Sequence, residues 1–143
     1  MTLNLKTLAA RNTSTFQLLD GNDEPLFAPD AQGNPDATKP VRVTVYGPGS
    51  KEYQRVQANA QNRLVERMRK RGKAAPSADE RLRDQAEQLA DLTVAFENLE
   101  YDGLQGRDLA LAIYGDGSLG FITEQVNKHA ADWANFTKAS QPT

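Results

Sequence analysis

The chain has 143 residues, enough for one domain that buries a core of its own. Its 17 basic and 19 acidic side chains give a net charge of -2, so no overall positive field favours nucleic acid or an acidic membrane surface. The sequence contains no cysteine, which excludes disulfides, thiolate metal sites and thiol nucleophiles.

The N-terminal segment does not have the pattern of an export signal. Residues 1–10 carry three leucines but lack a basic leading region and a continuous apolar core. Nowhere does the sequence approach the eighteen consecutive apolar residues of a membrane-spanning helix. We therefore expect a soluble intracellular protein that has no membrane partner.

Turn-forming and alternating residues predict a β-rich part over residues 12–47. Residues 15–19 favour a strand, which a cluster of Asp, Gly, Asn and Pro then ends, and residues 26–27 favour a short second strand. Prolines and a glycine in 28–39 predict a mobile loop without regular structure. The clearest strand covers 41–46, where three valines alternate with polar or aromatic residues, the period of a half-covered antiparallel sheet.

A first helix is expected after Gly47-Pro48-Gly49. Ser50 can cap it, because the hydroxyl accepts a hydrogen bond from an unpaired amide of the first turn, and Glu52 adds favourable charge there. Apolar residues then recur at intervals of three or four and form a stripe along the helix: Tyr53, Val56, Ala60, Leu64 and Met68. Basic residues crowd its C-terminal end, where cations suit the helix dipole.

A second helix begins near Pro76. Ser77 and Glu80 have the spacing of a capping box, in which each side chain reaches the backbone amide of the other residue. A second apolar stripe follows at alternating intervals: Leu82, Ala86, Leu89, Thr93 and Phe96. The two helices are expected to form an antiparallel hairpin.

Shorter elements are expected in the C-terminal part. After a turn at Asp102-Gly103, residues 108–114 favour a short helix that Gly115 ends. Ser118 is expected to cap a last helix, whose apolar stripe is Ile122, Val126, Ala130 and Trp133. Residues 138–143 are expected to form a flexible tail.

These patterns together predict the α+β class. We expect a single domain over residues 1–143, with a small N-terminal antiparallel β-sheet in 12–47. The helical hairpin and the C-terminal helices occupy 50–137.

Few residues carry catalytic or ligand-binding chemistry, and each has a better structural explanation. The single histidine, His129, has no cysteine or metal-spaced carboxylates to work with, so we interpret it as a helix-surface residue. Residues 47–51 lack the glycine spacing of a phosphate loop, and residues 115–118 lack the closing Glu of a calcium loop. We assign no catalytic, cofactor-binding or metal-binding residue and expect a protein that is not an enzyme.

Two sequence features are candidates for binding partners. The basic run Arg67 to Lys73 could contact phosphates, but it is short and lacks interleaved aromatic residues, so nucleic acid is not the expected partner. Aromatic residues are the other feature, although at helical spacing such residues are more often core than recognition patch. As candidate partner-binding residues we select exposed faces near Tyr53, Tyr101, Trp133 and Phe136.

In the order of its segments the chain resembles the tail assembly chaperones of long-tailed bacteriophages and prophages. The resemblance covers about residues 15–136. It rests on a β-rich start, a basic helix, an acidic second helix and three short segments: Val-Tyr-Gly-Pro-Gly-Ser-Lys-Glu-Tyr at 45–53, Phe-Glu-Asn-Leu-Glu-Tyr-Asp-Gly at 96–103, and Phe-Ile-Thr-Glu-Gln-Val at 121–126 followed by Asp-Trp-Ala-Asn-Phe at 132–136.

The resemblance implies a noncatalytic protein of the host bacterial cytoplasm. Such a chaperone binds the long helical tape measure protein, keeps it soluble, assists assembly of the tail tube around it and is absent from the finished virion. The tail tube protein and further copies of the chain stay open as additional partners. The alternatives are a structural tail or head-tail connector subunit and a small nucleic-acid-binding regulator that uses Arg67 to Lys73.

Overall fold

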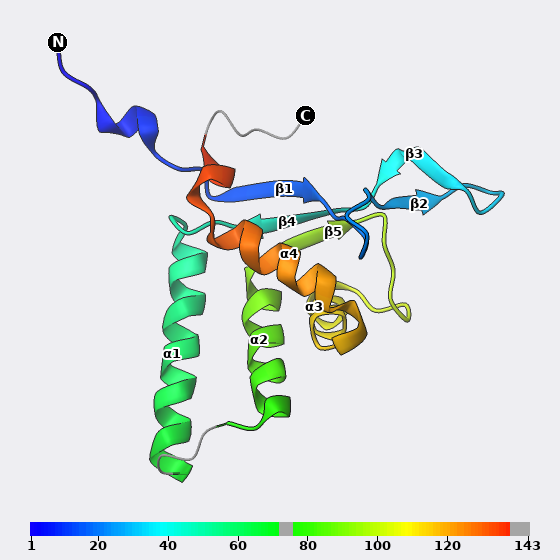
Figure 1. Cartoon of the computed structure of the whole chain (residues 1–143). Helices are drawn as coiled ribbons and strands as arrows, with labels where there is room; N and C mark the ends of the chain where they lie inside the picture. Colours follow the sequence, from blue (N-terminus) through cyan, green and yellow to red (C-terminus); the bar gives the residue numbers. More distant parts are fainter. Residues whose placement is uncertain (72–75, 138–143) are drawn as a thin grey trace.

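A three-stranded antiparallel sheet lies at the centre of the computed structural model, which describes residues 1–71 and 76–137 (Figure 1). Its strands have the order β1 (Thr13–Gln17), β4 (Arg42–Tyr46) and β5 (Thr93–Glu97). The fold is therefore α+β, as the sequence predicts. The predicted tail over 138–143 lies outside the described residues.

The strand predicted most clearly, β4, is central and has the predicted alternation. Val43 and Val45 are fully buried, and Val41, just before the strand, is nearly so. Phe16 of β1 and Phe96 of β5 are the register partners of Val43, so one row of apolar side chains crosses this face of the sheet. On the opposite face, the hydroxyls of Thr15 and Thr44 form a cross-strand hydrogen bond of 2.7 Å.

Helices cover the apolar face of the sheet and complete the core. These are α2 (Ala78–Leu92), α3 (Gly106–Tyr114) and α4 (Gly120–Ala131), and α4 crosses the sheet (Figure 1). The largest fully buried side chains come from separate parts of the chain: Leu18, Leu89, Tyr114 and Phe136. Burial of such side chains is the main favourable contribution to folding.

A two-stranded sheet occupies the segment predicted to be an irregular loop, so that prediction was wrong. Strands β2 (Phe27–Pro29) and β3 (Pro35–Pro40) pair antiparallel. Asp30 orders the turn between them, because its carboxylate accepts hydrogen bonds from the amides of Gln32 at 2.9 Å and Asn34 at 3.0 Å. The prolines lie at the ends of this short ladder, where a strand tolerates a missing amide hydrogen.

The predicted helical hairpin is present, and both predicted caps are confirmed. In α1 (Lys51–Arg71) the amide of Tyr53 donates to the Ser50 hydroxyl at 3.0 Å. At the start of α2 the amide of Glu80 donates to the Ser77 hydroxyl at 3.2 Å. The two helices run antiparallel and side by side (Figure 1).

The end of α2 differs from the prediction. The helix stops at Leu92, and Thr93 and Phe96 belong to β5 instead of to the helical stripe. The Thr93 hydroxyl donates to the Leu89 carbonyl at 2.8 Å as the chain becomes extended. Because β4 offers a free edge at this point, the β-branched and aromatic residues 93–97 join the sheet. A strand from the helical part thus completes the N-terminal sheet.

The C-terminal elements agree in part with the prediction. Helix α3 ends before Gly115 as expected. Ser118, however, lies within the short 3₁₀ helix η2 (Gly117–Leu119), which the side chain of Asp116 caps, so Ser118 is not the cap of α4. Helix α4 ends at Ala131, and Trp133 starts a separate 3₁₀ helix, η3 (Trp133–Phe136), capped by Asp132.

Gly47 provides a test of the packing between the sheet and η3. A Cβ at this buried position would lie 2.6 Å from Cγ of Phe136, whose ring is fully buried. We expect Gly47→Ala to lower the free energy of unfolding by about 1–3 kcal/mol, measured by urea denaturation. Gly21→Ala is the control, since nothing lies within 4 Å of a Cβ there. Equal effects of both substitutions would contradict this packing.

Candidate partner-binding surface

The four aromatic residues selected from the sequence lie on three parts of the chain and differ in exposure. Phe136 is fully buried, so it belongs to the core and offers no surface to a partner. Trp133, three residues earlier in η3, is 58% exposed and its ring lies over Gly49. Tyr53, in the first turn of α1, is half-buried against the core.

Tyr101 is held in place by a carboxylate. Its hydroxyl donates to Asp116 at 2.9 Å, which raises the pKa of Tyr101. Hydrogen bonds from Ser118 and then from Tyr101 lower the pKa of Asp116. This contact ties the loop before α3 to the start of η2, so Tyr101 has a structural task whether or not a partner contacts it.

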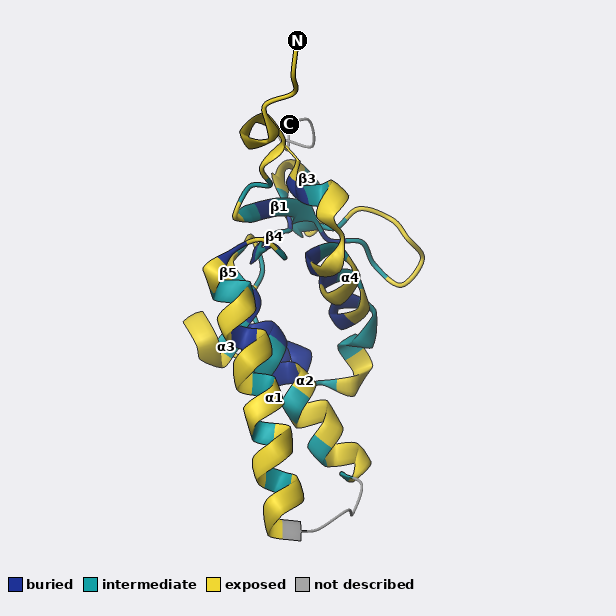
Figure 2. Ribbon diagram, turned by 90° about the vertical axis from the view of Figure 1, so that its left-hand side faces the viewer, coloured by how far each residue is buried: buried dark blue, intermediate teal, exposed yellow. Residues whose placement is uncertain are grey.

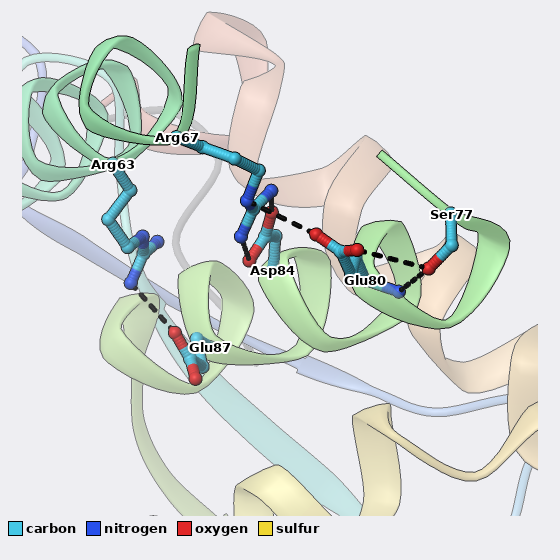
Figure 3. Close-up of polar contacts among 6 residues, drawn as sticks. All are labelled: Arg63, Arg67, Ser77, Glu80, Asp84 and Glu87. Atoms are coloured by element: carbon cyan, nitrogen blue, oxygen red, sulfur yellow. Dashed lines mark hydrogen bonds and ion pairs between the residues drawn. The ribbon is translucent and has the colours of Figure 1, made fainter. Parts of the chain in front are cut away.

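Ion pairs hold the outer half of the α1–α2 hairpin together (Figure 3). Arg63 donates to Glu87 at 2.9 Å, while Arg67 donates to both carboxylate oxygens of Asp84 and lies 3.3 Å from Glu80. The hydrogen bond from Arg67 lowers the pKa of Asp84, and Asp84 in turn raises the pKa of Arg67. In this outer half of the hairpin, matched charges therefore join the two helices.

Several residues of the basic run Arg67 to Lys73, which we considered as a phosphate-binding site, form ion pairs within the protein. Arg67 faces the acidic residues of α2, and Arg69 and Lys70 lie 3.7 and 4.0 Å from Glu66 on their own helix. Gly72 and Lys73 lie outside the described residues. The cations described in this run therefore have carboxylates beside them, which weakens the local positive field.

The polar interface leaves apolar residues of α1 exposed. Leu64, Val65 and Met68, which we call the distal apolar row, are 42%, 49% and 50% exposed. Leu64 and Met68 continue the apolar stripe in the sequence, but α2 presents acids to α1 where a buried stripe would need apolar partners. Figure 2 shows this end of the hairpin largely exposed. The regular spacing of Glu80, Asp84 and Glu87 is the signal in the sequence that could have predicted this polar interface.

His129 is not the surface residue that the sequence analysis expected. Its ring stacks on Phe16 with centroids 3.8 Å apart, and its Nε2 lies 2.9 Å from the Ser14 hydroxyl. Burial lowers the pKa of His129 to about 4, which the nearby Asp132 only partly opposes. Serine and histidine can form a nucleophile and base pair, but Ser14 is only 4% exposed, so we interpret this contact as packing of α4 on β1.

Among the described residues, no cluster of three or more His, Asp or Glu side chains could hold a metal ion. In the same part of the chain, no helix has both the length and the apolar character to cross a membrane. Comparisons with protein-family models, with curated proteins and with solved structures found no match to this chain. Any function must therefore be argued from the surfaces described above.

The lowered pKa of His129 predicts that the free energy of unfolding depends on pH. Because its pKa falls from 6.5 in the unfolded chain to about 4 in the fold, the unfolded state binds the extra proton between these values. The stabilisation is complete above pH 6.5 and declines as the pH falls towards 4, by about 1.4 kcal/mol per pH unit at most. Urea denaturation between pH 5 and 7 measures this slope.

The matching variant is His129→Phe. It removes the only histidine of the chain, so the slope between pH 5 and 7 should flatten even if the variant is less stable overall. An unchanged slope would show that another group titrates there.

The hairpin ion pairs predict a second pH and salt effect. We expect Asp84→Asn to lower the thermal unfolding midpoint at pH 7 by a few degrees, because Arg67 loses its hydrogen-bonded carboxylate. Since the pKa of Asp84 is lowered in the fold, its contribution is present above pH 3.8 and disappears as the pH falls through the lowered value. The difference from the unmodified chain should therefore shrink in acid and in high salt.

Asp102→Asn is the control for this experiment. Asp102 is exposed, has a φ of 52° that Asn tolerates, and lies outside the hairpin. A midpoint lowered equally by both substitutions would argue against a specific role of the Arg67–Asp84 pair.

Proposed function

We propose that this chain is a noncatalytic tail assembly chaperone of a long-tailed phage or prophage. It would bind and solubilise the tape measure protein in the host bacterial cytoplasm, assist assembly of the tail tube and leave before the virion is complete. Two things support the proposal: the order of segments resembles this class of protein, and the distal apolar row lies on a hairpin that ion pairs hold in place. The distal apolar row is the observation that carries it.

The row suits a helical client. Leu64 and Met68 are four residues apart on α1, so they form one ridge, with Val65 beside it. Such a ridge can pack into the groove of a second helix. A long helical protein exposes apolar stripes before it assembles, and covering them suppresses aggregation.

The size of the row favours reversible binding. Full burial of a Leu, Val or Met side chain contributes about 1.5–3 kcal/mol, and each of these three is already about half buried. Together they could contribute only about 2–4 kcal/mol before the costs of association are subtracted. One chaperone would therefore bind weakly, and several copies along a long client would be needed to keep it soluble. Weak binding also allows tube subunits to displace the chaperone without nucleotide hydrolysis.

The test is co-expression with the long helical protein encoded in the same tail gene cluster. We expect the unmodified chain to raise the soluble fraction of this client several-fold and to co-elute with it. The double variant Leu64→Glu, Met68→Glu should lose most of this effect, because charge on the row cannot be buried against a client helix. Arg55→Glu, also exposed on α1 but on the side of the helix opposite to Leu64, lowers the net charge by the same two units and should keep the effect.

Two results would overturn the proposal. A client whose solubility does not respond to the chain would remove the chaperone role. Purified tails that contain the chain in stoichiometric amounts by mass spectrometry would instead assign it to the structural subunits. Circular dichroism of each variant checks that the fold is intact.

A further inference from the structure

One edge of the central sheet is open. Strand β5 ends the strand order β1–β4–β5, and among the described residues no strand pairs with its outer side. The register shifts between Thr44 and Val45 of β4, and opposite this shift Val94 and Ala95 of β5 are exposed. Such an edge presents unpaired amide and carbonyl groups that can accept another strand.

A groove of about 700 Å³ runs along this edge. Strand β5, the end of α2, the loop before α3 and α3 itself line it. Its larger apolar side chains include Val94, Phe96, Leu99, Leu104 and Leu109. An open strand edge beside an apolar groove is the arrangement by which proteins bind extended peptides, since the edge supplies hydrogen bonds and the groove takes alternate side chains.

The charged residues that line the groove indicate which kind of segment it can bind. Asp91 and Glu100 line it, and Arg107 is already hydrogen-bonded to Asp91 at 2.9 Å. Glu97, at the end of β5, does not line the groove and lies 3.9 Å from Arg42 of β4. Asp91, Glu100 and Arg107 together leave the lining of the groove with one net negative charge. An apolar segment that has basic and no acidic side chains therefore complements the groove.

The N-terminal arm, residues 1–11, has this composition. It contains Lys6 and Arg11, no acidic residue, and three leucines at 3, 5 and 8 that are 64% to 72% exposed. The arm projects away from the body of the protein and is exposed along most of its length (Figures 1 and 2). Its base is anchored where the Arg11 amide donates to the Phe136 carbonyl at 2.7 Å.

We propose that the arm of one copy adds to the open edge of β5 in a second copy. In an extended arm Leu3 and Leu5 point to the same side and enter the groove, while Lys6 lies near its acidic rim. The 3₁₀ turn η1 (Leu5–Leu8) must open, which breaks only exposed hydrogen bonds such as that from the Lys6 amide to the Asn4 side chain. Water replaces those bonds at little cost. The contact does not involve the distal apolar row, so it does not rest on the proposed function.

Sedimentation of the full chain over a range of micromolar concentrations tests the contact. We expect a species larger than the 15.7 kDa monomer whose population rises with concentration. The arm variant Leu3→Asp, Leu5→Asp and the groove variant Leu104→Asp should each weaken association at least about tenfold. Leu82→Asp is the matched control, because Leu82 is similarly exposed but lies on α2, outside both proposed surfaces, and it should associate like the unmodified chain.

A peptide of residues 1–9 with a fluorescent label separates the two halves of the contact. It should bind the arm variant, whose groove is intact and vacated, and lose binding to the Leu104→Asp chain. A chain that stays monomeric and does not bind this peptide would overturn the proposal. So would association that survives the arm variant, or a groove that binds the tape measure protein but not the peptide.

Discussion

The whole structure depends on the burial of one face of β4. This strand pairs with β1 on one side and with β5 on the other, so it joins segments that are about eighty residues apart in the sequence. Its inward valines, Val43 and Val45, are fully buried beneath the helices. Because a shift of one residue would turn both valines to solvent, this burial sets the register of all three strands.

Helix α4 is held on the sheet by contacts of a different kind. The ring of His129 stacks on Phe16 and is hydrogen-bonded to Ser14, and Phe136 lies behind Gly47 where any side chain would clash. The neutral ring tolerates this half-buried place, whereas the charged ring would not. The one histidine of the chain therefore helps to hold α4 on β1, and its partner Ser14 is buried by this packing.

Away from this core, ion pairs join the elements, and two apolar surfaces remain exposed. Ion pairs of Arg63 and Arg67 join the outer parts of α1 and α2, so the apolar side chains of α1 remain uncovered. At the other end, the outer edge of β5 stays open beside its groove. The two surfaces differ in chemistry: a helical ridge suits a helical client, and a strand edge suits an extended arm. A protein with both could associate with itself without covering the surface proposed for its client.

Elements whose signals are local could be predicted from the amino-acid sequence. The valine alternation of β4 and the caps Ser50 and Ser77 depend on neighbouring residues, and they appear where predicted. Features that depend on distant partners could not be predicted in this way, because they appear only when the chain is folded. Residues 93–97 became a strand because β4 offered an edge, and Leu64 stayed exposed because α2 presents acids to α1. The same holds for the candidate partner-binding surface. The sequence shows which residues are aromatic. Whether one of them is buried, like Phe136, or exposed, like Trp133, depends on what packs against it in the fold.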